Sequence, residues 1–254
     1  MRETPSQQHL LRVCAASVDR CTVIRVAKRT RDRLGAYLRQ ARRGGPRWML
    51  RHLLSYPSQK RIREECARVA REHLRNHPSD LPPADRLTEY RVPSANGLAT
   101  IDLLRQLAPD LAFQNGVGLL RAEMFQVPRL GTWNLHPSVL PGVRGVDPLF
   151  WALFEQRPEW IGCTLHVIDA GIDSGPIIAR QHVTAAPAEH PGIISAHGLL
   201  AGGELLAAAL RFTAEHGHPP PLEPHDRSAS VYRSWIDGRD LVRLWRDRLN
   251  QSSS

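Results

Sequence analysis

The feature that most limits the fold of this chain is a regular alternation of short apolar runs and helical patterns after residue 87. Runs rich in β-branched and other apolar residues predict strands, and apolar residues at helical spacing predict helices. Strands separated by helices of about ten residues indicate βαβ units. The sequence therefore predicts an α/β fold with a Rossmann-like, mainly parallel sheet flanked by helices. We expect strands at residues 87–92, 111–113, 131–136, 161–168 and 176–183, and helices at 98–107, 148–156 and 191–216.

The first part of the chain departs from an ordinary doubly wound sheet, which starts with a strand and a glycine-rich turn. Here a helical pattern comes first, at residues 8–18, so the first strand of the fold is expected to be missing, either because it is lost or because the start of the chain is misassigned. A β-branched run at 21–27 predicts the next strand. The chain contains no GxGxxG and no GxxxxGK[ST] sequence, which leaves dinucleotide and P-loop nucleotide binding without support. Further helices are expected at 28–42, 48–55 and 59–75, with a proline-rich loop at 76–84.

The length of 254 residues is enough for one sizeable core. We expect an α/β domain over residues 1–202 and a helical C-terminal extension over 203–254, packed on the same domain, with a terminal helix at 237–250. The apolar stretch at 198–212 contains Glu204 and Arg211, and we expect it to be too short and too polar to span a membrane. No secretory signal follows Met1, so the expected location is cytoplasmic.

The formal net charge of +9 raises the question of a nucleic-acid partner. Basic residues are concentrated between residues 25 and 63, with few aromatic residues among them. This pattern favours an arginine-rich, solvated helical face over a base-stacking surface, although RNA binding through this region stays an alternative. The four cysteines show no metal-ligand spacing, so we expect free thiols and no metal.

Three polar residues stand where an α/β sheet places its ligands, at the carboxyl ends of strands. Asn134 and His136 lie two apart on an expected strand, so their side chains should leave the same face. Asp173 follows on a later loop. An amide can donate to an oxygen that gains negative charge, an imidazole can exchange a proton near neutral pH, and a carboxylate can orient the imidazole. This set suits direct transfer to a substrate nucleophile through a tetrahedral intermediate, without an acyl-enzyme.

The segment around these residues resembles the formyltransferase fold family. The resemblance is carried by five motifs in order: Asn134–Ser138, Leu140–Pro141, Arg144–Gly145, Gly162–His166 and Asp173–Gly175. It is clear from about residue 105 to 181 and faint before residue 87. The resemblance implies that Asn134, His136 and Asp173 are catalytic, and that Leu140–Pro141 is a cis peptide. We expect His166 to support its strand and His136.

The resemblance also implies a folate pocket, with 10-formyltetrahydrofolate as the formyl donor. Its residues would come from two loops, one after the strand before the Asn134 motif and one leading to Asp173. The expected pocket residues are Val117, Gly118, Leu119, Leu120, Ile168, Asp169, Gly171 and Ile172, and the expected substrate-binding residues are Ser138, Arg144 and Gly145.

The acceptor is less constrained than the donor. The run from Arg144 to Leu153 is most similar to stand-alone amino-sugar N-formyltransferases, which implies a primary amine of a small molecule as acceptor, and a homodimer is possible. The region after Val183 is too short for the further domain of methionyl-tRNA formyltransferases. Two alternatives stay open: a methionyl-tRNA formyltransferase-like or RNA-binding protein, and an inactive homologue shortened at its first strand.

Overall fold

The computed structural model describes residues 4–27, 30–76, 87–186 and 188–251. The loop expected at 76–84 lies almost entirely outside them. So do the side chains of most of the basic region between residues 25 and 63.

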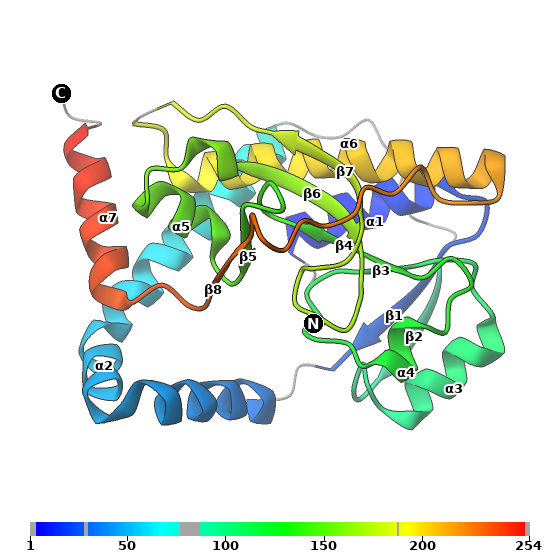
Figure 1. The fold of residues 1–254 in the computed structure, drawn as a ribbon, viewed down its shortest axis with the longest axis horizontal. Coiled ribbons are helices and arrows are strands. Elements are labelled where there is room, and N and C mark those ends of the chain that lie inside the picture. The colour runs from blue at the N-terminus through cyan, green and yellow to red at the C-terminus, as the bar shows by residue number, and fades with distance from the viewer. Residues whose placement is uncertain (1–3, 28–29, 77–86, 187, 252–254) are drawn as a thin grey trace.

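The centre of the molecule is a four-stranded sheet with the order β3-β4-β6-β7 (Figure 1). Strands β3 and β4 are parallel, whereas β4–β6 and β6–β7 pair antiparallel. The antiparallel pairing of β6 with β7 has a simple cause, because a short loop joins these two strands, and a parallel return would need a crossover of a dozen or so residues. The strand bounds are β3 Ala112–Gln114, β4 Thr132–His136, β6 Gly162–Val167 and β7 Ile177–His182.

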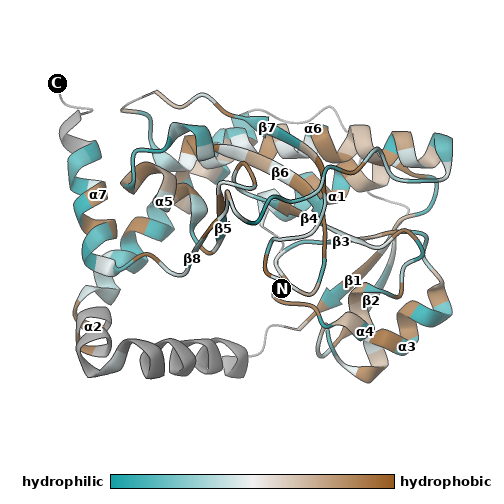
Figure 2. Ribbon diagram, viewed as in Figure 1, coloured by the Kyte–Doolittle hydropathy of each residue, from teal (hydrophilic) through white to brown (hydrophobic). Residues whose placement is uncertain are grey.

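Two helices cover the sheet and form the main core with it. Helix α6 (Pro191–His216) packs against β6 and β7, and α1 (Pro5–Ser17) packs against α6. The buried side chains between them come from all three layers, and Figure 2 shows the apolar residues along β6. This cluster consists of Leu10, Val13, Trp133, Leu165, Leu206, Ala209 and Leu210.

A second, two-stranded parallel sheet pairs β1 (Thr22–Val26) with β2 (Thr88–Val92). Helix α3 (Leu98–Leu107) and the short α4 (Ala122–Phe125) follow it. The long α2 (Thr30–Asn76) connects β1 to β2. The expected break near Gly45 is confirmed by its non-helical φ of 69° and ψ of −175°. The expected gap between residues 55 and 59 is wrong, because the helix continues through Pro57.

The C-terminal part lies beside the central sheet. Strand β5 (Val143–Gly145) is followed by α5 (Pro148–Phe154), and it pairs in parallel with β8 (Val231–Arg233). Helix α7 (Gly238–Gln251) packs on α2 through buried Ile62, Cys66 and Leu241. The boundary expected after residue 202 falls inside α6. The division into an α/β domain and a helical C-terminal extension stays a prediction.

The predicted α/β class is confirmed: among the described residues, three of five strand pairs are parallel, and helices flank the sheets. Helix α6 has the expected bounds. The expectation that its apolar stretch is too short and too polar to span a membrane is wrong, because by length and composition alone this helix could cross one. Half of its most apolar window is buried inside the structure. That is the behaviour of a core helix.

Candidate functional site

The site lies where β4 ends. Asn134 and His136 both belong to β4, whose parallel partner β3 contributes Gln114 opposite Asn134. The antiparallel partner β6 contributes His166 on the other side, again opposite Asn134. The expected cis peptide Leu140–Pro141 follows shortly after the strand. Three neighbouring strands therefore bring polar side chains to one edge of the sheet.

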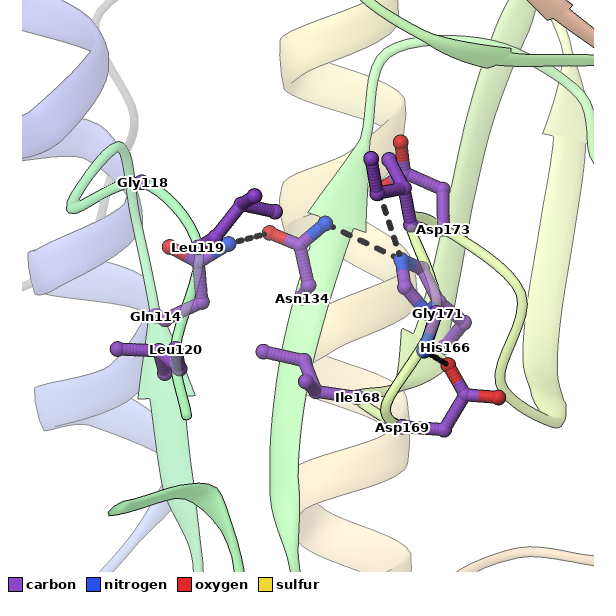
Figure 3. Close-up of a pocket in the computed structure, with 11 residues that line it drawn as sticks. Gln114, Gly118, Leu119, Leu120, Asn134, His166, Ile168, Asp169, Gly171 and Asp173 are labelled. Carbon is purple, nitrogen blue, oxygen red and sulfur yellow. Dashed lines mark hydrogen bonds and ion pairs between the residues drawn. The ribbon is translucent and has the colours of Figure 1, made fainter. Parts of the chain in front are cut away.

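The Asn134 side chain is held from both sides (Figure 3). Its Oδ1 accepts a hydrogen bond from Gln114 Nε2, and its Nδ2 lies 3.1 Å from His166 Nε2. His166 Nδ1 lies 3.0 Å from the Val167 carbonyl oxygen, which can only accept. The His166 proton therefore resides on Nδ1, and its Nε2 accepts from Asn134. One amide hydrogen of Asn134 Nδ2 stays available to a ligand.

Asp173 joins the two histidines. Its carboxylate lies 3.5 Å from His136 Nδ1 and 3.7 Å from His166 Nε2, and it accepts a hydrogen bond of 3.0 Å from the Gly145 N–H. Asp173 has a φ of 47°, in the left-handed region that non-glycine residues enter mainly when they are Asn or Asp. His136 Nε2 donates to the Val143 carbonyl oxygen at 3.0 Å. Nδ1 is thus the atom of His136 that gains or loses a proton, and it faces the carboxylate.

Burial and charge act in opposite directions on this pair. Burial lowers the pKa of His136, and the charge of Asp173 only partly offsets this. Burial alone would raise the pKa of Asp173, but His136, His166 and the Gly145 N–H outweigh it and lower that pKa to about 2. Asp173 is therefore ionised at neutral pH and His136 neutral, the combination that can take up a proton.

A pocket opens beside Asn134 and Asp173, and most of the expected folate residues line it (Figure 3). Val117 and His136 do not line it, and His136 is only 2% exposed. His166, expected to play a supporting part, does line it. The lining residues are Gln114, Gly118, Leu119, Leu120, Asn134, His166, Ile168, Asp169, Gly171, Ile172 and Asp173.

The three residues expected to bind substrate lie outside this pocket. Ser138 is fully buried and donates from its hydroxyl to the Val143 carbonyl oxygen at 2.8 Å. Arg144 donates to the Ser230 hydroxyl and to the Ile172 carbonyl oxygen. Gly145 contributes its N–H to Asp173. In this arrangement they contact other site residues, and their role toward substrate stays a prediction.

Four residues near the site were not predicted from the sequence. Gln114 orients Asn134, and Arg227 lies 3.1 Å from Asp169. Ser230 binds Arg144, and burial and the charge of Arg144 lower the pKa of His225. Three of these follow α6, far along the chain from the motifs. Only Gln114 had a local signal, as the last residue of the strand beside Asn134.

The pocket has features that suit a bound pterin. Gln114 Oε1 is buried without a hydrogen-bond partner, so it can accept from a ligand N–H. Leu119 is 70% exposed and offers an apolar surface to an aromatic ring. Within the described ranges, no group of three His, Cys, Asp or Glu side chains could hold a metal ion.

Comparison with known proteins gives a consistent family. Residues 60–210 match the family described as formyl transferase. The methionyl-tRNA formyltransferase of Syntrophus aciditrophicus is 28% identical over 64% of this chain and 53% of its own length. That of Halorhodospira halophila is 34% identical over 61% of this chain and 54% of its own length. The chain thus spans about half the length of these relatives.

Two solved structures share the fold at low sequence identity. A formyltransferase of Anoxybacillus kamchatkensis, in complex with UDP-4,6-dideoxy-4-formamido-L-AltNAc and tetrahydrofolate, has a TM-score of 0.50 at 19% identity. It covers 70% of this chain and 86% of its own. A sugar N-formyltransferase of Shewanella sp. FDAARGOS_354 has a TM-score of 0.50 at 13% identity and covers 88% and 87%. Because the family match extends over more than half of the sequence, this chain belongs to the formyl transferase family.

Proposed function

We propose that this protein transfers a formyl group from 10-formyltetrahydrofolate to a primary amine of a small molecule. The observation that carries the proposal is the convergence of an amide, a carboxylate and a buried imidazole at one edge of the sheet. Asn134 and Asp173 line the same pocket, and His136 Nδ1 lies 3.5 Å from Asp173. These are the groups that direct acyl transfer to an amine needs.

Asn134 stabilises the formyl oxygen as it gains negative charge. Gln114 and His166 fix the orientation of the amide, so that Nδ2 is presented before the substrate arrives. A donor that is already oriented needs no reorganisation during the reaction, and a single donor of this kind contributes a factor of roughly 10²–10³ to turnover.

Asp173 and His136 take the proton that the attacking amine loses. The carboxylate faces the pocket, and the buried His136 Nδ1 lies on its other side. The carboxylate gains the proton or shares it with the imidazole, so the charge that develops stays between two partners. When the bond between the formyl carbon and the donor nitrogen breaks, this proton is available to the leaving tetrahydrofolate nitrogen. A positioned proton acceptor contributes a factor of roughly 10²–10⁴.

Gln114, Leu119 and the loop at residues 168–172 bind the donor. 10-Formyltetrahydrofolate supplies the activated formyl group when it is bound. The unpartnered Gln114 Oε1 accepts a hydrogen bond from it, and Leu119 packs on its ring.

For the acceptor, we propose an amino sugar, carried as a nucleotide-linked sugar. The two sugar-modifying or sugar-complexed structures are similar over most of their length, 86% and 87%. A second candidate acceptor is the amine of methionyl-tRNA, because the curated relatives are methionyl-tRNA formyltransferases of up to 34% identity.

Incubation with 10-formyltetrahydrofolate and each acceptor class tests both proposals. We expect mass spectrometry to detect a formyl adduct on an amino-sugar nucleotide. An adduct on methionyl-tRNA alone would replace the first acceptor by the second. No adduct with any amine, from folded protein, would leave an inactive homologue.

A further inference from the structure

The chain between α6 and α7 returns along the catalytic edge of the central sheet, as the orange segment of Figure 1 shows. We call residues 217–237 the C-terminal strap. At its start, Glu223 exchanges backbone hydrogen bonds with Ile177 and forms an ion pair with Arg180 at 2.6 Å. Further along, Arg227 contacts Asp169 in the pocket wall. The strap is thus bound to the loop–strand unit that carries Asp173.

Strand β8 of the strap pairs with β5, the strand that positions both catalytic partners. The Val143 carbonyl oxygen of β5 holds His136, and the Gly145 N–H holds Asp173. The β8 contacts bracket these groups, because Val231 N–H donates to Gly142 and Val146 N–H donates to Arg233, each at 2.9 Å.

Gly145 is required for this close approach. It has a φ of 102°, and a Cβ built there would lie 2.1 Å from the Arg233 carbonyl oxygen. A side chain at this position is therefore incompatible with β8 in its present place. Gly145 therefore both donates to Asp173 and allows β8 of the strap to approach β5.

Arg144 makes the most direct link between the strap and the catalytic loop. Its Nε donates to Ser230 Oγ at 2.5 Å, and its Nη1 donates to the Ile172 carbonyl oxygen at 3.0 Å. Ile172 immediately precedes Asp173, whose backbone is in the left-handed region. One guanidinium group thus joins β5, the strap and the residue before the carboxylate through two different nitrogens, whereas a lysine would have to reach both acceptors from a single nitrogen.

The far end of the strap is anchored to α5. Trp151 Nε1 donates to the Ser234 carbonyl oxygen at 2.8 Å, and Arg233 pairs with Glu155 at 2.7 Å. Ile236 is 2% exposed in the core shared with α7. The strap is therefore held firmly on both sides of Ser230.

We propose that the C-terminal strap is a positioning element of the active site, acting through the Ser230–Arg144–Ile172 link to hold Asp173 against β5 and His136. The inference deepens the proposed formyl transfer and rests on it for the kinetic part of its test. Ser230 and Arg144 act through other residues, and neither lines the pocket.

Replacing Ser230 by alanine removes the hydroxyl that holds Arg144. We expect kcat for formyl transfer to fall by about 10- to 100-fold, with KM for the amine unchanged, since misplacement of a catalytic group by about 1 Å costs on this order. Amide hydrogen exchange at Gly145 should become faster, because its acceptor Asp173 is less firmly held. Exchange at Leu165 in β6 should not change, which separates local loosening from lower global stability. Ser230→Thr keeps the hydroxyl and should restore both quantities.

Ser228→Ala is the matched control. Ser228 lies on the same strap, and its hydroxyl donates to the Asp226 carboxylate two residues away. If Ser230→Ala does not fold, Arg144→Lys keeps the positive charge and serves as the second variant, with the same expected loss. The proposal is overturned if Ser230→Ala behaves like Ser228→Ala in exchange at Gly145, or if exchange rises while kcat stays at the wild-type value. Should wild-type protein transfer no formyl group, the proposed function fails, while the exchange measurement still tests the link.

Discussion

Charged side chains lie in different environments at the four-stranded sheet and at the sheet formed by β1 and β2. In the four-stranded sheet, five of the six β6 residues are buried, and Asp173 is held by two histidines and a backbone N–H. In the two-stranded sheet, β1 and β2 are mostly accessible, and Glu89 pairs with Arg25 at the surface. A desolvated charge with fixed partners interacts strongly with them, so replacing it should have a large effect on activity. An exposed ion pair is screened by water, so replacing it should have a small effect.

The largest expected effect is that of Asp173→Asn. The amide cannot take the proton from the attacking amine, so we expect kcat to fall by roughly 10²–10⁴-fold. Steady-state kinetics would measure it, with a urea unfolding curve to show that the variant is folded. Glu89→Gln is the matched control in the other sheet and should leave kcat unchanged. If kcat fell equally in Asp173→Asn and Glu89→Gln, the proposed difference between the two sheets would be wrong.

Asn134→Ala should have the next largest effect. Loss of one oriented donor to the formyl oxygen should reduce kcat by roughly 10²–10³-fold. The KM for the folate should change little, because Gln114 and Leu119 remain. Wild-type kcat in this variant would mean that another group stabilises the oxygen.

The packing of the two sheets can be compared in the same way. Leu165 in β6 has no exposed surface and lies in the main core, so Leu165→Ala should reduce the free energy of unfolding by about 2–5 kcal/mol. Val23 in β1 is only partly buried, and Val23→Ala should cost less than half as much. Urea denaturation measures both, and a larger loss for Val23 would contradict the difference in burial.

Acid should lower stability in part through Asp173. Its folded pKa of about 2 lies below the ordinary 3.8, so the group contributes stability at pH values above 3.8 that is lost as the pH falls toward 2. The difference corresponds to about 2 kcal/mol. Asp173→Asn should flatten the fall in urea midpoint over this range, and Glu89→Gln should change it least. If the urea midpoint of Asp173→Asn fell with pH as steeply as that of the wild type, the carboxylate would not be stabilised by its two histidines and the Gly145 N–H.

The positions of the central strands and most of the pocket lining could be predicted from the sequence because their signals are local, whereas the antiparallel pairing of β6 with β4 and β7 could not. Asn134 and His136 lie on one strand. Seven of the eight residues expected for a folate pocket line the pocket. Each of these depends on a few consecutive residues whose types match a strand end or a turn.

The strap could not be predicted, since its contacts join residues far apart in the chain. Strands β5 and β8 have three residues each, too few for a periodic pattern, and they pair across a separation of almost ninety residues. Arg144 looked like a substrate ligand because a guanidinium suits phosphate, but its partners here are Ser230 and Ile172. The continuation of α2 through Pro57 could likewise not be predicted from the local sequence, because proline normally ends a helix.

The most direct test follows an isotope-labelled formyl group from 10-formyltetrahydrofolate in a single turnover. Direct transfer predicts that wild-type protein places the label on the acceptor amine, with none retained on the protein, and that Asn134→Ala and Asp173→Asn do so far more slowly. Label bound to a protein side chain, or transfer by Asp173→Asn at the wild-type rate, would contradict it.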